Sequence, residues 1–259
     1  MKRIIAIALF LFSLPAVAGI QSKAVEYEHN GDKLTGYLYW DDSIKGKRPG
    51  VMVVHEWWGL NDYAKKRARM IAKEGYVAFA ADMYGDNRVT TDPAQAKEWM
   101  MEVTADVEGW QERAALGLEQ LINSGMVDPE RTAAMGYCFG GGTILQMAYS
   151  GTKAKGVIGY HASLPAAPES AKGKINAKVM IFHGAADGFV APEVITNFQT
   201  KLQESGAQWE FVSFGGDVRH GFTNPDAGNF GIENLKYDAY ADQASWQRTL
   251  DFYSTLFAQ

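Results

Sequence analysis

The chain has 259 residues, of which 47% are hydrophobic and 21% charged, and its formal net charge is −5. That length and apolar content suit one large folded domain and exclude a disordered or collagen-like chain. A single cysteine excludes an intrachain disulfide and a cysteine-based zinc site, and the acidic balance is a poor match for nucleic acid or anionic lipid.

The first eighteen residues have the pattern of a secretory signal peptide. Met1-Lys2-Arg3 gives a positive start, an uncharged apolar run follows to Pro15, and Ala16-Val17-Ala18 is a cleavage signal. The apolar run is shorter than the ~20 residues that a membrane-spanning helix needs. We therefore expect cleavage after Ala18 and a periplasmic location, with no membrane insertion of the mature chain; the alternative is an uncleaved anchor.

After this segment, strand and helix patterns alternate along the chain. Segment 25–39 alternates polar and apolar residues around Asn30-Gly31, which indicates a β-hairpin. Further strands are expected at 50–55, 76–81, 133–137, 156–161, 178–183 and 209–214. Helices are expected at 62–74, 92–103, 106–123, 140–149, 192–205 and 233–257. This order predicts a single α/β domain over residues 19–259, with a mainly parallel sheet between helices and a ligand site at the carboxyl ends of the strands.

The only cysteine lies in segment 136–142, which reads Gly-Tyr-Cys-Phe-Gly-Gly-Gly between a predicted strand and a predicted helix. This is the nucleophile-elbow pattern of α/β-hydrolases, with Cys138 in the usual serine position. A helix N-terminus at the sulfur favours the thiolate. The alternative is a small buried cysteine in a glycine-rich turn, but the position between strand and helix favours a nucleophile.

Two further residues could complete a catalytic triad. Asp187 lies in the loop after the strand predicted at 178–183, and His220 follows the strand predicted at 209–214. The order Cys138, Asp187, His220 is the nucleophile–acid–histidine order of α/β-hydrolases. Asp187 would accept a hydrogen bond from the imidazole and fix its tautomer, while the other ring nitrogen faces the sulfur.

Three other histidines, His55, His161 and His183, end predicted strands. Each is expected to be a hydrogen-bonded structural residue. A three-histidine metal site is an alternative that no ligand spacing supports, so no metal is expected. The oxyanion hole of a hydrolase needs two N–H donors, for which we predict the backbone of Phe139 and of Trp57.

Together these segments resemble the dienelactone hydrolase family. The matching pieces are Glu56 with Trp57-Trp58-Gly59, Asp82-Met83-Tyr84, the elbow at 136–142, and the pair Asp187 and His220. The resemblance covers nearly all of the mature chain. It implies an α/β-hydrolase fold, a Cys-His-Asp triad without cofactor, and the opening of lactones or cleavage of esters. It also implies that Glu56 contacts the resting thiol and helps to generate the thiolate.

The residues alone give a similar but less specific interpretation of Glu56. A carboxyl group beside two tryptophans at a strand end should have a raised pKa, which suits a proton acceptor. The alternative is a structural carboxylate paired with an arginine such as Arg219.

The chain departs from the family pattern at three positions. One is Gly221, after the histidine, where other members often have serine. Better-known members have arginine two residues after the tyrosine and four residues after the histidine, where this chain has Asp86 and Asn224. Neither cation that would hold a substrate carboxylate is at its expected place, although Arg88 or Arg219 could substitute. The pocket is predicted to be aromatic and to contact substrate through Trp58, Tyr84 and Phe222, each of which is as typical of a core as of a pocket wall.

These observations predict a periplasmic hydrolase that cleaves a neutral or weakly charged small-molecule ester or lactone through an acyl-cysteine intermediate. A non-catalytic small-molecule binding protein on the same fold is the alternative, because fold does not determine function. A thiol redox protein is a third possibility. The absence of a second cysteine in the sequence argues against it.

Overall fold

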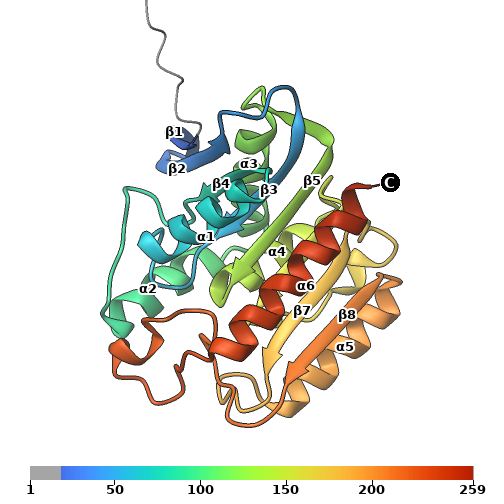
Figure 1. Ribbon diagram of the computed structural model, residues 1–259. Helices are drawn as coiled ribbons and strands as arrows, with labels where there is room; N and C mark the ends of the chain where they lie inside the picture. The colour runs from blue at the N-terminus through green and yellow to red at the C-terminus, as the bar shows by residue number, and fades with distance from the viewer. Residues whose placement is uncertain (1–18, 259) are drawn as a thin grey trace, which may run out of the picture.

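The computed structural model describes residues 19–258, and the predicted signal peptide at 1–18 lies outside them. An eight-stranded sheet runs through the domain in the order β1-β2-β4-β3-β5-β6-β7-β8 (Figure 1). Strands β3 to β8 are parallel, whereas β1 and β2 form an antiparallel hairpin that joins the sheet through β4. The strands are β1 (Ile20–His29), β2 (Asp32–Asp41), β3 (Arg48–Val54), β4 (Val77–Ala81), β5 (Val127–Tyr137), β6 (Gly156–Tyr160), β7 (Lys178–Gly184) and β8 (Trp209–Phe214). The predicted mainly parallel sheet is confirmed.

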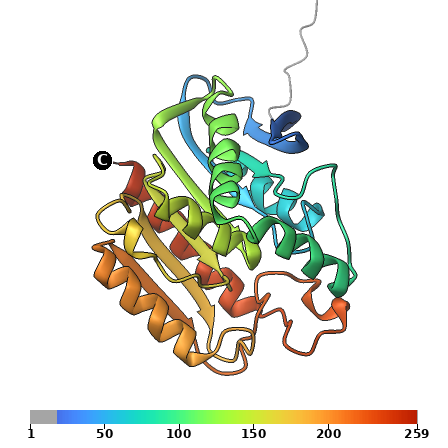
Figure 2. The same cartoon turned by 180° about the vertical axis from the view of Figure 1, so that it is seen from behind.

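Helices cover both faces of this sheet and create two cores. On one face lie α1 and α6 (Figure 1), and on the other lie α3, α4 and α5 (Figure 2). Neighbouring residues of β3 alternate between the cores: Met52 and Val54 face one, and Val51 and Val53 face the other. The helices are α1 (Asp62–Lys73), α2 (Pro93–Thr104), α3 (Val107–Ile122), α4 (Phe139–Tyr149), α5 (Pro192–Ser205) and α6 (Ala239–Phe257). In residues 19–258, no helix has the length and apolarity needed to cross a membrane.

Local sequence signals account for several of these boundaries. Asn30 and Gly31 have positive φ values of 52° and 89°, as a type I′ hairpin turn requires. Helix α2 begins at Pro93 after Asp92, whose side chain accepts from the N–H of Ala94 at 2.9 Å. The predicted hairpin and this predicted helix start are therefore confirmed.

Three predicted boundaries are wrong. Strand β1 begins at Ile20 rather than at residue 25, so the hairpin is longer than predicted. Strand β5 begins at Val127 rather than near residue 133, because residues 128–131 are charged or proline, lie exposed or half-buried, and hide the strand pattern. The last helix begins at Ala239 rather than at 233, where Asp238 caps it and accepts from the N–H of Ala241 at 2.8 Å. The N–H of Lys236 instead donates to the carbonyl of His220 at 3.0 Å, which ties this segment to a predicted site residue.

The predicted site residues follow different strands at the same edge of the sheet. Glu56 follows β3, Cys138 follows β5, Asp187 follows β7 and His220 follows β8. The carboxyl ends of parallel strands meet at one edge, so residues far apart in sequence come together there.

Candidate active site

Cys138 lies on a strained turn between β5 and α4. Its φ of 55° and ψ of −115° fall in a region that residues with side chains rarely adopt. A Cβ atom on Gly136 would lie 2.1 Å from the carbonyl oxygen of Gly140, and one on Gly140 would lie 2.5 Å from that of Val54. Glycine at these two positions therefore allows the strand and helix to approach closely. The turn has the form of a nucleophile elbow, and Cys138 on it is partly exposed.

His220 and Asp187 form a buried pair. The Nδ1 atom of His220 lies 2.7 Å from Oδ2 of Asp187, and Oδ1 of Asp187 accepts from the N–H of Phe189 at 2.9 Å. Burial alone would raise the pKa of Asp187, but the hydrogen bond and charge of His220 outweigh this effect and lower the pKa. An ionised Asp187 therefore keeps a proton on Nδ1 of His220. The other ring nitrogen, Nε2, faces away from Asp187.

The Nε2 atom of His220 is buried without a protein hydrogen bond of normal geometry, and the ring lines the same cavity as Cys138. Burial opposes protonation of His220, but the nearby sulfur of Cys138 and the hydrogen bond with Asp187 outweigh burial and raise its pKa. With a raised pKa, the imidazole of His220 can carry a proton on Nε2 beside the sulfur of Cys138. Loose contacts of this kind are common in catalytic pairs before substrate binds.

The cavity beside Cys138 has a volume of about 190 Å³. Its polar lining comes from Cys138, Ser163 and His220, and the remaining wall is apolar: Trp57, Met100, Phe139, Phe189, Val190 and Leu235. Within residues 19–258, none of the side chains that line it belongs to Asp, Glu, Lys or Arg. The cavity therefore suits an uncharged group next to the sulfur.

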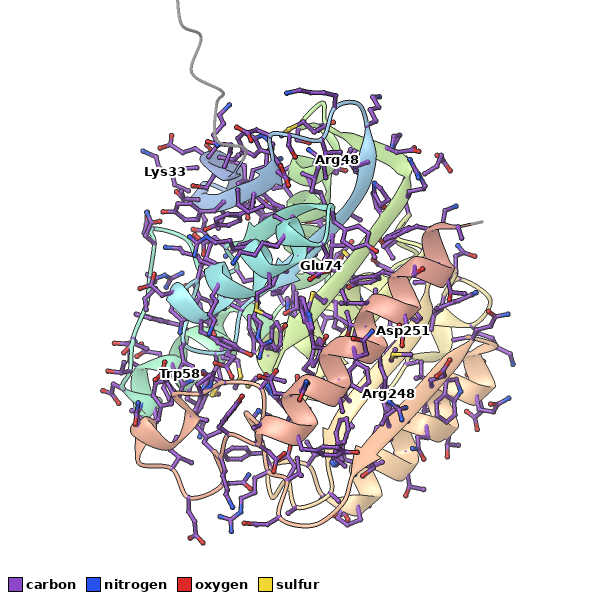
Figure 3. The ribbon with its side chains drawn as sticks, viewed as in Figure 1. Lys33, Arg48, Trp58, Glu74, Arg248 and Asp251 are labelled. Carbon is purple, nitrogen blue, oxygen red and sulfur yellow. The ribbon has the colours of Figure 1, made fainter. Side chains whose placement is uncertain are left out.

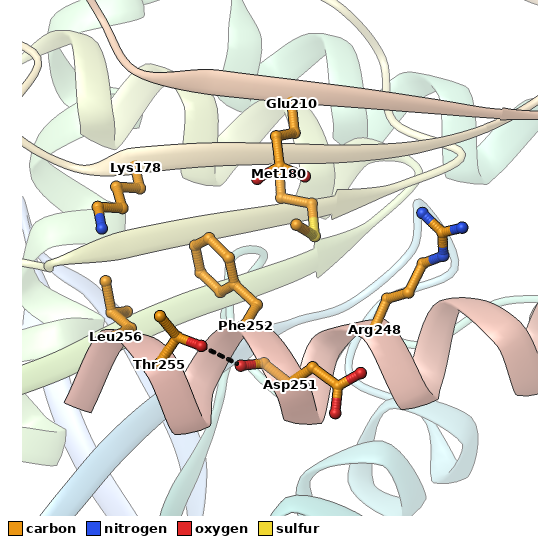
Figure 4. Close-up of a pocket in the computed structure, with 8 residues that line it drawn as sticks. All are labelled: Lys178, Met180, Glu210, Arg248, Asp251, Phe252, Thr255 and Leu256. Carbon is orange, nitrogen blue, oxygen red and sulfur yellow. Dashed lines mark hydrogen bonds between the residues drawn. The ribbon is translucent and has the colours of Figure 1, made fainter. Parts of the chain in front are cut away.

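A second hollow, of about 300 Å³, lies between α6 and the strands β7 and β8 (Figure 4). Charged residues such as Lys178 and Arg248 line it, and Asp251 accepts there from the hydroxyl of Thr255 through its backbone carbonyl at 3.0 Å. This hollow contains none of the predicted site residues, so the cavity beside Cys138 is the candidate active site.

Three aromatic residues predicted to contact substrate are absent from the cavity wall, namely Trp58, Tyr84 and Phe222. Trp58 is 1% exposed and stacks on Phe230 with 4.1 Å between ring centroids, beside α2 (Figure 3). Phe222 packs edge-on against His161 in the core under α6. The hydroxyl of Tyr84 donates to the carbonyl of Trp57 at 3.0 Å. Substrate contact by these three residues stays a prediction, and their positions give each of them a packing role.

Hydrogen bonds fix the loop after β3, which carries Trp57, the second predicted donor of the oxyanion hole. Nδ1 of His55 donates to the carbonyl of Glu56 at 2.6 Å, and its Nε2 accepts from the N–H of Met83 at 3.2 Å, so the ring is neutral. Because a trans peptide is planar, the N–H of Trp57 points away from His55. The N–H of Phe139 is the first of helix α4 and needs no partner within that helix. This arrangement suits the predicted oxyanion hole, which stays a prediction.

Glu56 lies beside the site and outside the cavity lining. The side-chain amide of Asn224 donates to Oε2 of Glu56 at 2.8 Å, and both residues are buried. Burial raises the pKa of Glu56 to about 7, although the hydrogen bond from Asn224 opposes this rise. The alternative partner considered for Glu56 is wrong, because Arg219 binds Asp217 at 2.7 Å and the carbonyl of Glu233 at 2.8 Å.

The other cation considered for a substrate carboxylate also lies elsewhere. Arg88 binds Glu102 at 3.0 Å and stacks over the ring of Trp99, and it is not part of the cavity wall. Among residues 19–258, no group of three or more His, Cys, Asp or Glu side chains is arranged to hold a metal ion.

Comparisons with known proteins agree with this geometry. The sequence profile described as "Dienelactone hydrolase family" matches residues 34–257. The chain belongs to the dienelactone hydrolase family. A relative from Aquifex aeolicus named "Putative carboxymethylenebutenolidase" is 29% identical over 240 residues, which cover 89% of this chain and 97% of the relative. The predicted family and the predicted class of enzyme, a hydrolase of carboxylic esters or lactones, are confirmed.

Solved structures confirm the α/β-hydrolase fold. A crystal structure of a dienelactone hydrolase-like promiscuous phosphotriesterase from metagenomic libraries is 35% identical, with a TM-score of 0.88, and the match covers 92% of this chain and 98% of that one. A dienelactone hydrolase homologue from Klebsiella pneumoniae, at 20% identity and a TM-score of 0.71 over 91% of this chain and 99% of that one, shares the fold.

Proposed function

We propose that this hydrolase cleaves neutral esters or lactones with compact apolar groups through an acyl-cysteine intermediate on Cys138. The supporting observation is the buried His220–Asp187 hydrogen bond, 2.7 Å long, on a ring that shares an apolar cavity with Cys138. The cavity wall supplies apolar contacts and, among residues 19–258, contains no Lys or Arg that could bind a substrate carboxylate.

The steps follow from these positions. The Cys138 thiolate attacks the carbonyl carbon, and the backbone N–H groups of Phe139 and Trp57 donate to the oxygen that becomes negative. As the C–O bond breaks, the His220 imidazolium gives its proton to the leaving alkoxide and leaves a thioester. Neutral His220 then takes a proton from water, the resulting hydroxide attacks the thioester, and the thiolate leaves.

Glu56 has the role of a nearby proton acceptor for the resting thiol. With a pKa raised to about 7, it exchanges a proton readily at neutral pH. Glu56 accepts its hydrogen bond from the neutral side-chain amide of Asn224 and not from an arginine. A substrate therefore needs no carboxylate to draw a cation away from Glu56.

The test is turnover of p-nitrophenyl butyrate and of simple γ-lactones, with intact-mass measurement during the reaction. We expect turnover and a transient acyl adduct in the native protein, and neither in Cys138→Ala. An exposed-site variant, Ser43→Ala, serves as the control. Full ester turnover by Cys138→Ala would refute the acyl-cysteine mechanism, and the absence of turnover and adduct in the native protein would favour a binding protein.

Phosphotriester hydrolysis is a second candidate activity. The similarity to the metagenomic phosphotriesterase at 35% identity favours it, as does the mainly apolar cavity wall. Diethyl p-nitrophenyl phosphate is a suitable probe, and attack by Cys138 would release p-nitrophenol and leave a diethylphosphoryl adduct on the sulfur. Absence of both products would exclude this activity.

We also propose export to the periplasm with cleavage after Ala18, which rests on the pattern of residues 1–18. Expression of the full chain in a Gram-negative host should give a periplasmic product whose first residue is Gly19. A membrane-bound product with an intact N-terminus would show an uncleaved anchor instead.

A further inference from the structure

A buried chain of hydrogen bonds runs behind the active site. Nε of Arg67 in α1 donates to the hydroxyl of Tyr63 at 3.2 Å, which lies 2.6 Å from the hydroxyl of Thr223. The hydroxyl of Thr223 in turn lies 2.8 Å from Nε2 of His161. All four residues are buried, and the mechanism above uses none of them. We call these four residues the support chain.

The donors and acceptors of the support chain have one favoured direction. Arg67 can only donate, so the hydroxyl of Tyr63 accepts from it and donates to Thr223. The hydroxyl of Thr223 then donates to Nε2 of His161, which leaves the proton of a neutral ring on Nδ1. In the opposite arrangement, Thr223 accepts from both Tyr63 and Nε2 of His161. Its own hydroxyl proton and Nδ1 of His161 are then both buried without a partner. This costs more free energy than the favoured direction, in which only Nδ1 of His161 is unpaired.

The support chain ends against the catalytic histidine. The ring of His161 packs edge-on to that of His220, with centroids 4.9 Å apart, and His161 has a strained φ of 36°. Thr223 belongs to the loop 220–224, where the N–H of Asn224 donates to the carbonyl of Gly221 at 2.8 Å. The carbonyl of Thr223 also accepts from Arg67. The short loop 220–224 thus carries three residues. They are His220, Thr223 of the support chain, and Asn224, which donates to Glu56.

We propose that the support chain is a positioning device: it holds His161 neutral against His220 and fixes loop 220–224, so that His220 faces Cys138 and Asn224 faces Glu56. This inference rests on the proposed role of His220 and Cys138. Thr223 and His161 are positioning residues, since they act through the loop and not on the substrate.

Charge explains why His161 must stay neutral. A proton on His161 would place a second positive charge beside the His220 imidazolium and weaken the thiolate that depends on it. The other titratable or charged groups around the two rings come from six segments: Arg67 of α1, Glu56 after β3, Tyr137 of β5, Cys138 before α4, His183 of β7 and Asp187 after β7. Burial is the main cause of the lowered pKa of His161, and the nearby cations add to it.

The test compares three variants. Thr223→Val keeps the shape of the side chain but breaks both hydrogen bonds, whereas Thr223→Ser keeps the hydroxyl. Thr249→Val is the matched control, because Thr249 is another buried threonine, hydrogen-bonded to Tyr160 and to the carbonyl of Ser245 away from the site. The readouts are kcat and KM for p-nitrophenyl butyrate, the pH midpoint of Cys138 alkylation by iodoacetamide, and the melting temperature.

We expect Thr223→Val to lower kcat roughly tenfold with little change in KM, since small misplacements of catalytic groups are costly. Its alkylation midpoint should move to higher pH, because a poorly held imidazolium stabilises the thiolate less. Thr223→Ser should restore both values, and Thr249→Val should lower only the melting temperature. A Thr223→Val variant that melts earlier with an unmoved midpoint would overturn the proposal.

Alkylation needs no substrate, which keeps the two proposals separable. If the native protein turns over no ester, the proposed function fails while the midpoint shift still tests the support chain. If the native protein turns over esters and Thr223→Val leaves both kcat and the midpoint unchanged, only the positioning role fails.

Discussion

Glu56 is a carboxyl group held where ionisation is unfavourable. Its pKa rises to about 7 from a usual 4.5, so the folded protein keeps a proton that the unfolded chain releases. By linkage, stability falls as the pH rises from 4.5 to about 7 and the loss stays in place above that. We therefore predict that Glu56→Gln, which cannot ionise, is more stable than the native protein at pH 8 by up to about 3 kcal/mol.

Chemical denaturation at pH 4.5 and pH 8 measures this effect. The difference between Glu56→Gln and the native protein should be small at the lower pH and large at the higher. The exposed Glu102 offers a control, because Glu102→Gln should show no such pH-dependent gain. An equal effect of Glu56→Gln at both pH values would contradict a raised pKa.

Asn224 tunes the same carboxyl group. Its amide donates to Glu56 at 2.8 Å and favours the ionised form, so it holds the pKa lower than burial alone would set it. We predict that Asn224→Ala raises the pKa of Glu56 further and moves the acidic limb of kcat/KM to higher pH, with activity lost chiefly at and below pH 7. The pH profile of ester hydrolysis measures the shift.

A suitable control is the exposed Asn229, whose side-chain amide donates to Asp226 at 3.2 Å. Asn229→Ala should leave the profile in place. A uniform loss of activity for Asn224→Ala at every pH would mean that Asn224 acts by packing rather than through the Glu56 carboxyl.

At the site, the sequence predicts those residues whose chemistry has a motif. Cys138, Asp187 and His220 follow a known order along the chain, and the structure brings His220 together with each of the other two. The bond between Asn224 and Glu56 joins residues 168 positions apart, and no local pattern marks it. Aromatic composition likewise cannot separate a wall residue such as Trp57 from a packed one such as Trp58.

At the scale of elements, helix α2 contributes Met100 to the cavity wall, and only Ala96 and Val103 of this helix are buried. With so little buried surface, we expect the start of α2 to depend on its Asp92 cap. Losing such a cap costs about 1 kcal/mol. We predict that Asp92→Ala loosens α2 and raises KM for apolar esters several-fold with kcat nearly unchanged, which steady-state kinetics will measure.

Asparagine also caps helices well, so Asp92→Asn should keep the native KM. Faster proteolysis within α2 in Asp92→Ala, but not in Asp92→Asn, would locate the change. If both variants raise KM alike, the negative charge of Asp92 matters rather than the cap.

Element boundaries were predictable where a cap or turn residue marks them. The Asn30-Gly31 turn and the Asp92-Pro93 start lie where the sequence places them. The start of α6 was not predictable from the sequence. Segment 233–238 has helical spacing, but its backbone forms hydrogen bonds with the loop that carries His220. Tertiary hydrogen bonds outweighed local preference at that point.

For the whole molecule, a buried ion pair joins the early and late parts of the chain. Arg67 of α1 binds Asp242 of α6 at 2.6 Å, across 175 positions, and their side chains are 4% and 17% exposed. Removing one partner of such a pair leaves the other charge without compensation, which costs about 3–5 kcal/mol in buried sites. Because Asp242 keeps some contact with water, we expect the lower end of that range for Arg67→Met.

A double-mutant cycle makes this prediction quantitative. Asp242→Leu in the Arg67→Met background should restore part of the lost stability, since an apolar pair no longer carries an unpaired charge. Lys201→Met, which breaks the exposed pair with Glu204, should change stability by less than about 1 kcal/mol. If Arg67→Met costs no more than Lys201→Met in urea unfolding, the ion pair does not hold the two parts of the chain together. The support chain would then depend on packing around Thr223 rather than on Arg67.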